Sequence, residues 1–216
     1  MIDFHTHSLL SDGALLPTEL VRRARVAGYR AMAITDHADS SNIESVIAQL
    51  KKVTKQLNTD RTFKVIPGVE LTHIPPSLIP AMVKLARKLG AAIVVGHGET
   101  LAEPVEPGTN AAYIKAKVDI LAHPGLVTKA ECEAAVANSV HFEITSRAGH
   151  SITNGHVASM AKKHKVRMLV NTDSHSPSDL ITLKRAELVA LGAGLDKTDF
   201  GRIKENAQEL LKKIRL

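Results

Sequence analysis

The first thirteen residues, Met1-Ile-Asp-Phe-His-Thr-His-Ser-Leu-Leu-Ser-Asp-Gly13, hold the pattern on which the interpretation of the whole chain depends. Ile2–Phe4 is a short apolar run, long enough for one buried strand, and His5 and His7 follow at its end. In an extended chain residues i and i+2 point to the same side, so both imidazoles can face one point just past the strand. Asp12 follows on a glycine-broken loop. Two imidazoles and a carboxylate suit Zn, Mn or Fe better than Ca.

A chance pair is the alternative, because the chain has eleven histidines among 216 residues. The remaining sequence decides between the two, according to whether other strands also end in metal-binding side chains. Apolar, β-branched runs alternate with helical patterns, which is typical of a parallel α/β architecture. We expect strands at 2–4, 31–34, 64–69, 91–95, 118–122, 140–144 and 166–170. We expect helices at 17–27, 41–57, 76–89, 110–116, 128–137, 153–164, 178–191 and 198–215.

This alternation gives about seven strand–helix units and one extra helix, in one α/β domain over residues 1–216. Pro67 within the third strand predicts a bulge or break there. The hydrophobic fraction of 44% and the charged fraction of 23% are ordinary for a globular protein. Four Phe, two Tyr and no Trp argue against a base-stacking surface for single-stranded nucleic acid.

Cellular location is predicted from cysteine content and from the absence of targeting patterns. Cys132 is the only cysteine, so no intrachain disulfide can form and a reducing compartment is the simpler assumption. We see no run long enough to span a membrane and no signal-peptide pattern at the N-terminus. We therefore expect a cytoplasmic protein with no membrane partner.

The formal net charge of +6 has two explanations. Basic pairs scattered along the predicted helices can simply be solvated, which we favour, or they can attract a phosphorylated or acidic substrate.

Six of the seven expected strands are followed closely by His or an acid. In parallel α/β folds active sites gather at the carboxyl edge of the strands, so a closed barrel would bring these groups to one mouth. Nine side chains are too many for one ion but sufficient for two or three if a carboxylate bridges. Packed together without metal, these imidazoles would repel when protonated and leave buried nitrogens unsatisfied. The candidates are His5, His7, Asp12, His37, Glu70, His97, His123, Asp173 and His175.

These motifs resemble the PHP (polymerase and histidinol phosphatase) family. The motifs that carry the resemblance are Asp-Phe-His5-Thr-His7, Ser11-Asp12-Gly13, Ile34-Thr-Asp36-His37, Pro67-Gly-Val-Glu70, Gly96-His97, Ala122-His123-Pro124 and Asn171-Thr-Asp173-Ser-His175. The resemblance implies a distorted seven-stranded TIM-like (β/α)7 barrel with a trinuclear metal site and phosphoesterase activity.

The resemblance also implies how the ligands are shared among three divalent ions (Zn, Mn or Fe). His5, His7, Glu70 and Asp173 would hold the first ion. Glu70 would bridge to a second ion held by His97 and His123, and Asp12, His37 and His175 would hold the third.

Side chains that contact substrate are less clearly marked in the sequence. Arg147 follows the sixth strand and can hold phosphate oxygens bidentately, or it is an ordinary loop arginine. His73 can line the mouth, or it is an ordinary loop histidine. The acidic loop that carries Glu99, Glu103 and Glu106 is interpreted as solvated, although it could meet a substrate amine.

Six other residues receive assignments outside the ligand set. Glu143 lies within the sixth strand, with its orientation undetermined. Asp36 is expected to orient His37, as metal-binding histidines usually require. Four histidines outside the motifs are interpreted as structural or exposed: His141, His150, His156 and His164.

We predict a metal-dependent phosphoesterase in which a metal-bound hydroxide, with no side-chain nucleophile, hydrolyses a small, histidinol-phosphate-like phosphomonoester. One alternative is a nucleotide or nucleic-acid-end phosphoesterase or exonuclease with the same site, which is possible but not favoured. Others are an amidohydrolase-type C–N hydrolase, which usually has a longer chain, and a non-enzymatic metal-stabilised scaffold. The sequence leaves oligomeric state open.

Overall fold

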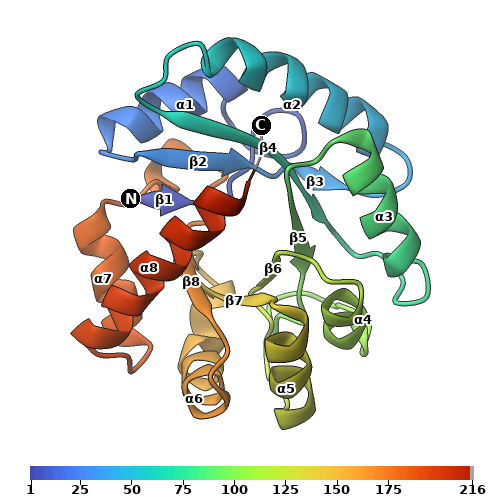
Figure 1. Cartoon of the computed structure of the whole chain (residues 1–216), viewed down its shortest axis with the longest axis vertical. Coiled ribbons are helices and arrows are strands. Elements are labelled where there is room, and N and C mark those ends of the chain that lie inside the picture. Colours follow the sequence, from blue (N-terminus) through green and yellow to red (C-terminus); the bar gives the residue numbers. More distant parts are fainter. Residues whose placement is uncertain (215–216) are drawn as a thin grey trace.

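The strands of the successive strand–helix units form one parallel sheet, in which they follow one another in chain order (Figure 1). The computed structural model describes residues 1–214. The sheet order is β1-β2-β4-β5-β6-β7-β8, with β3 paired to β4 and every pairing parallel. The strands are β1 (Ile2–Asp3), β2 (Ala31–Ile34), β3 (His37–Ala38), β4 (Lys64–Leu71), β5 (Ile93–His97), β6 (Ile120–Ala122), β7 (His141–Thr145) and β8 (Met168–Asn171).

The ring of strands nearly closes between β1 and β8, where side chains replace most of a backbone ladder. One isolated parallel bridge pairs Thr6 with Ser174. Asp3 accepts hydrogen bonds from the backbone N–H and the hydroxyl of Thr172, at 3.3 and 2.6 Å. From the other strand, Asn171 Oδ1 accepts from the N–H of Phe4 at 3.0 Å. The expected distorted seven-stranded α/β barrel is therefore confirmed, and this seam is where it is distorted.

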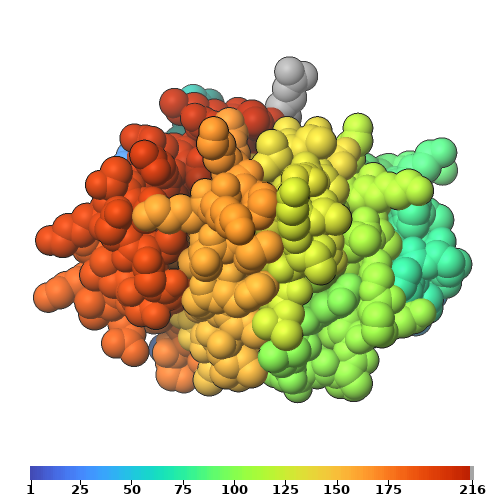
Figure 2. Space-filling view, turned by 90° about the horizontal axis from the view of Figure 1, so that it is seen from below, coloured from blue at the N-terminus to red at the C-terminus, as the bar shows by residue number. Residues whose placement is uncertain are grey.

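Helices surround the strands, and one of them crosses the end of the barrel (Figure 1). They are α1 (Pro17–Val26), α2 (Ile43–Leu57), α3 (Ile79–Leu89), α4 (Thr109–Lys115), α5 (Lys129–Asn138), α6 (Asn154–His164), α7 (Leu183–Gly192) and α8 (Lys197–Lys213), with 3-10 turns at His150–Thr153 and Pro177–Asp179. Seen from below, the covering segments of the second half of the chain lie side by side in order (Figure 2). Among residues 1–214, no helix combines the length and apolar character needed to cross a membrane.

Strand side chains alternate between two apolar cores, as the period of two requires. Outward residues such as Met32 and Phe142 pack against the surrounding helices. Inward residues such as Ile66 and Leu169 fill the barrel and pack against Leu210 of α8. Helix α8 thus plugs the barrel at the end where the strands begin. The opposite end, where the strands finish, is left for polar side chains.

Two expected features of the strands differ in the structure. No break occurs at Pro67, which pairs with Ile34 inside a continuous β4. The ladder with β5 begins only at Gly68, opposite Ile93, so the missing N–H of proline removes no hydrogen bond from that ladder. The second expected strand continues after two residues as β3, which pairs with the end of β4.

The expected helix at 178–191 is divided by two local capping interactions. Asp179 accepts hydrogen bonds from the N–H groups of His175 and Ser176, which closes a 3-10 turn. Helix α7 then begins at Leu183, where the Thr182 hydroxyl caps its first turn. The last residue of the expected final helix, 215, lies outside the described residues, and α8 ends at Lys213.

Candidate metal centre

The carboxyl ends of β1 and β8 lie side by side and carry the first group of candidate ligands. His5 and His7 flank Thr6, whose bridge to Ser174 fixes their register against Asp173 and His175. Nε2 of His7 lies 3.2 Å from Oδ1 of Asp173, and the rings of His7 and His175 stack at 4.1 Å. The i, i+2 spacing therefore brings both imidazoles that follow β1 to the same mouth, as predicted.

Glu70, at the end of β4, is the centre of the cluster. Its carboxylate is fully buried, and imidazole nitrogens of four histidines surround it. Oε2 lies 2.9 Å from Nδ1 of His37, 3.2 Å from Nε2 of His5 and 3.5 Å from Nε2 of His7. Oε1 lies 3.5 Å from Nε2 of His123. A carboxylate in this position can bridge neighbouring ions.

All nine candidate ligands are brought together in overlapping groups whose donor atoms lie within 4.8 Å of one another. The groups are Glu70, His97 and His123; His5, His7 and Glu70; His5, His123 and Asp173; and His7, Asp12, His37 and His175. The first group contains the residues expected to hold the second ion. The last group contains the residues expected to hold the third ion, together with His7.

Asp12 reaches the cluster because its loop turns back tightly against His7. A Cβ on Gly13 would meet the carbonyl oxygen of His7 at 2.4 Å, so only glycine allows this approach. The buried carboxylate of Asp36 accepts from the N–H and hydroxyl of Ser8, at 2.6 and 2.7 Å, and anchors the loop. Asp12 Oδ1 then lies 3.2 Å from Nε2 of His175.

The expected role of Asp36 is corrected by this geometry. Its carboxylate is used by the loop of residues 8–11, and the hydroxyl that meets Nδ1 of His37, at 2.7 Å, belongs to Thr72. Thr72 follows β4, and the short β3–β4 pairing brings it beside His37. Asp36 was expected as the partner because it precedes His37 in the sequence, but Thr72, brought in by the neighbouring strand, makes the contact instead.

Glu143 points inward, which the sequence left undetermined. Oε1 accepts from Nδ1 of His5 at 2.8 Å and from the amide of Asn171 at 2.9 Å. Oε2 accepts from the backbone N–H of His123 at 3.1 Å. With Nδ1 donating, Nε2 of His5 keeps its lone pair directed at the cluster, as a ligand must.

Two candidate ligands occupy strained backbone. His123 has φ of +28° and Asp173 has φ of +50°, the left-handed region that side chains other than glycine rarely adopt. Such residues cost on the order of 1–3 kcal/mol each and persist only where the surrounding structure holds them. Both lie just past strand ends, where the strain turns their side chains toward the mouth.

Mutual charge sets the protonation of the cluster. Burial opposes protonation of His5, but the Glu143 and Glu70 carboxylates raise its pKa well above the usual range. Burial and the neighbouring His37 lower the pKa of His7 well below its usual range. Burial raises the pKa of Asp173 to about 7, which His5 opposes and Glu70 reinforces. Protons and metal ions therefore compete for the same atoms.

Unsatisfied buried atoms indicate that the donor set fits metal ions. Within residues 1–214, most buried side-chain polar atoms that lack a hydrogen-bond partner belong to this cluster. They include Nε2 of His5 and His7, both carboxylate oxygens of Glu70 and Oδ1 of Asp173. Buried polar atoms are normally paired, and divalent ions would satisfy these lone pairs together.

The predicted substrate-side residues both lie at the rim. Nε of Arg147 lies 3.9 Å from Oδ2 of Asp173, and Nη1 lies 3.4 Å from Asp179. The exposed His73 lies beside His97, with ring centroids 5.0 Å apart.

The acidic loop after β5 differs from the solvated loop that we expected. Oε2 of Glu103 lies 3.1 Å from Nε2 of His97 and 3.0 Å from Nε2 of His73. The hydrogen bond from His97 holds the pKa of Glu103 well below its usual range. Oε1 of Glu103 also lies 3.4 Å from His150, whose ring stacks on His123 at 4.2 Å. In the sequence, the only sign of a role for Glu103 was the density of acidic residues in this loop. No local pattern in the sequence indicated that His150 would lie at the site.

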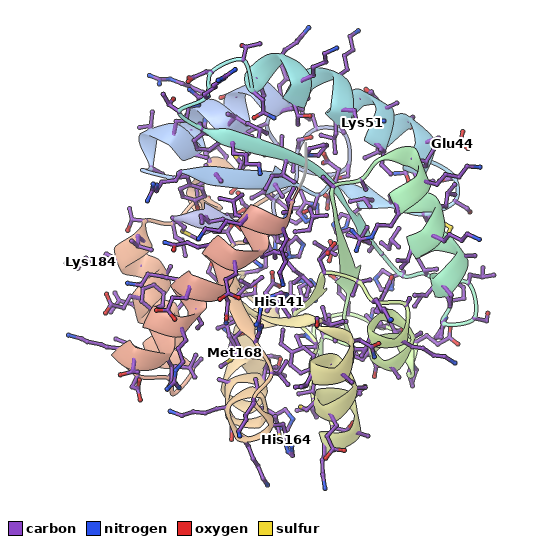
Figure 3. The ribbon with its side chains drawn as sticks, viewed as in Figure 1. Glu44, Lys51, His141, His164, Met168 and Lys184 are labelled. Atoms are coloured by element: carbon purple, nitrogen blue, oxygen red, sulfur yellow. The ribbon has the colours of Figure 1, made fainter. Side chains whose placement is uncertain are left out.

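The other histidines outside the motifs take structural or outer positions. His141 is buried at the start of β7, where its Nδ1 donates to the carbonyl of Asp119, and His156 donates to the carbonyl of Val127. Figure 3 shows His141 near the middle of the molecule and His164 at the outer end of α6.

Comparison with known proteins agrees with this geometry. The family model described as PHP domain matches residues 3–215. A Methanocaldococcus jannaschii protein named only as uncharacterized is 52% identical, covering 98% of this chain and 99% of its own. A probable phosphatase of Thermoanaerobacter sp. is 26% identical, covering 99% of this chain and 97% of its own.

Among solved structures, a chain of archaeal ribonuclease P with mature tRNA matches with a TM-score of 0.72. At 18% identity, over 98% of this chain and 90% of the other, that likeness concerns the fold alone. The match of the PHP model to nearly the whole chain confirms the resemblance seen in the strand-end motifs. The chain therefore belongs to the PHP domain family and is a hydrolase that acts on phosphoesters.

Proposed function

We propose that this protein is a metal-dependent phosphatase of small phosphomonoesters, with a substrate resembling histidinol phosphate. The nine clustered residues would hold two or three divalent ions, for which Zn, Mn and Fe are the candidates. The observation that carries the proposal is the buried Glu70 carboxylate, which has imidazoles of four histidines around it and, among residues 1–214, no aligned hydrogen bond to either oxygen. Divalent ions bound there would lower the pKa of coordinated water and polarise the phosphoryl group.

The protein's own side chains would orient the reaction. Glu143 holds His5 in the tautomer that directs Nε2 into the site, and Thr72 holds His37. The guanidinium of Arg147 would donate to phosphate oxygens at the rim and stabilise charge that develops during in-line attack. No side-chain nucleophile is required in this scheme.

The charges at the rim favour a small substrate over a nucleic acid strand. Carboxylates of Asp12, Glu103 and Asp179 lie around the mouth with Arg147. A strand brings phosphates along its whole length, and these would meet the carboxylates, whereas one phosphate needs only the centre and the guanidinium. Glu103 would also accept a hydrogen bond from a substrate amino group, which supports an amino-alcohol phosphate.

Phosphate release tests this proposal directly. Protein loaded in turn with Mn, Zn or Fe, with metal content measured, should hydrolyse an aryl phosphate, and His7→Ala should abolish the activity. A panel of amino-alcohol, sugar and nucleotide monoesters should then rank amino-alcohol phosphates first. Metal-loaded protein that releases no phosphate above the variant would refute the proposal.

The same assay separates the alternatives. Action on nucleic acid ends should weaken steeply with salt through counterion release, whereas turnover of a small monoester should change little. Activity on cyclic amides without phosphate release would favour C–N hydrolysis, and tight metal binding without any turnover would favour a scaffold. A cytoplasmic location, which the single buried Cys132 supports, is tested by fractionation.

A further inference from the structure

A cavity of about 600 Å³ lies at the opposite end of the barrel from the metal centre. It is lined by the first residues of β1 and β4, by β8 and by one side of α8. Lys64 begins β4 and Glu70 lies near its end, so the cavity wall at Lys64 lies roughly 20 Å from Glu70 at about 3.3 Å per residue, whereas Asn171 of β8, which also lines the cavity, lies two residues before Asp173. The described lining residues of the cavity include none of the nine candidate metal ligands.

Basic side chains dominate the polar lining of this cavity. Arg30, Arg61, Lys64, Lys204 and Lys212 all line it, and its described lining residues include no aspartate or glutamate. This contrasts with the catalytic mouth, where carboxylates outnumber the single guanidinium of Arg147 among the residues named above. Part of the net charge of +6 is thus concentrated at an end of the barrel where it cannot bind the substrate.

These basic groups are available to a ligand. The described part of the chain, residues 1–214, contains no ion pair that uses any of the five. Lys64 instead donates to the carbonyls of Leu211 and Ile214, which fixes its position at the end of α8. The guanidinium and ammonium groups at the rim belong to exposed residues. Uncompensated cations at one concavity favour a multiply charged anion.

The floor of the cavity is apolar and buried. Leu169, Val170, Phe200 and Ile203 line it with small exposed fractions. An apolar floor under a basic rim matches a ligand with a flat apolar body and a chain of phosphates. The volume is also in the range of roughly 300–1,000 Å³ that is usual for small-molecule sites.

We propose that this basic cavity binds a nucleoside polyphosphate, at a site separate from the metal centre. The ring system lies on the apolar floor and the phosphates meet the rim formed by Arg30, Arg61, Lys204 and Lys212. A nucleic acid strand fits less well, because successive bases need a row of exposed aromatic side chains, whereas the described lining residues include one aromatic side chain, Phe200.

Binding of the β,γ-imido analogue of ATP to the metal-loaded protein, measured by calorimetry, tests this site. Lys204→Glu with Lys212→Glu reverses two rim charges on one helix. Lys52→Glu with Lys55→Glu is the matched control, because both lysines are exposed on α2 and outside the cavity. We expect the cavity variant to weaken binding by roughly tenfold or more and the control to stay within about twofold.

Labelling of the wild-type protein gives a second readout that needs no variant. Periodate-oxidised ATP should modify Lys204 or Lys212, and inorganic tripolyphosphate should protect them less well than ATP because it lacks the ring. Equal affinity of the cavity variant and the wild type would overturn the proposal, as would labelling only elsewhere. Binding of an oligonucleotide but not of the ATP analogue would also overturn it. None of these outcomes depends on turnover, so failure here is distinct from failure of the proposed function.

Discussion

Replacement of Glu143 by glutamine tests how the protein positions its candidate metal ligands, because Glu143 contacts His5 and His123 but is not itself a candidate ligand. Each carboxylate oxygen of Glu143 accepts from a different side of the site: Oε1 from His5 and Asn171, and Oε2 from the N–H of His123. The glutamine amide has only one acceptor oxygen. Whichever way the amide is turned, its NH2 group therefore faces another hydrogen-bond donor on one side of the site.

The cost differs between the two orientations, but neither is free. If the amide nitrogen faces the backbone of His123, a buried N–H loses its acceptor, at a cost of about 1–3 kcal/mol. If it faces His5, the imidazole must accept at Nδ1 and carry its proton on Nε2, which removes the lone pair needed for a metal. Loss of such a supporting contact typically weakens metal affinity by about 10- to 100-fold, or roughly 1.4–2.7 kcal/mol.

We therefore expect Glu143→Gln to bind zinc or manganese about 10- to 100-fold more weakly in a chelator competition assay. Glu106→Gln, at an exposed position of the acidic loop, removes the same charge and should leave the affinity unchanged. Circular dichroism establishes that both variants are folded. An affinity of folded Glu143→Gln within twofold of wild type would refute the inference that this carboxylate positions His5.

Four further outcomes are expected. Burial raises the pKa of Asp3 to about 6, so the folded state binds the Asp3 proton more tightly than the unfolded state does, and the free energy of unfolding falls as pH rises from about 4 to 7. In urea titrations over this pH range, the unfolding free energy of Asp3→Asn should fall by about 3 kcal/mol less than that of the wild type, and parallel pH profiles of the two proteins would contradict this. Gly96→Ala would bring a Cβ to 2.5 Å from the Tyr113 ring and should cost about 1–3 kcal/mol in denaturant unfolding, unlike Gly155→Ala, where the space is open. Arg147→Ala should raise KM for a phosphomonoester by roughly tenfold or more, with partial recovery in Arg147→Lys, and an unchanged KM would exclude phosphate binding by this residue. Chelation of the metals should lower Tm, reversibly on adding them back, because buried lone pairs lose their partners; an unchanged Tm would argue against resident ions.

Much of the fold was predictable because its signals are local. Apolar runs alternating with helical patterns predicted a parallel barrel, and all seven expected strands are present with ends shifted by up to two residues. The candidate ligands were also found from the chain alone, since His5, Glu70 and His97 occupy one topological position, the end of a strand. A parallel barrel brings every such position to the same mouth.

Contacts across the barrel could not be predicted in this way. The position of Glu143 depends on the register of β7 with β8, and Glu103 reaches His97 only because a loop folds over the mouth. His150 stacks on His123 from a 3-10 turn after β7, with no local signal. The sequence by itself determined which side chains lie at strand ends, because strand position is encoded in neighbouring residues. Only the tertiary structure decided which of them touch, because contact depends on strand stagger and loop paths set by the packing of the whole barrel.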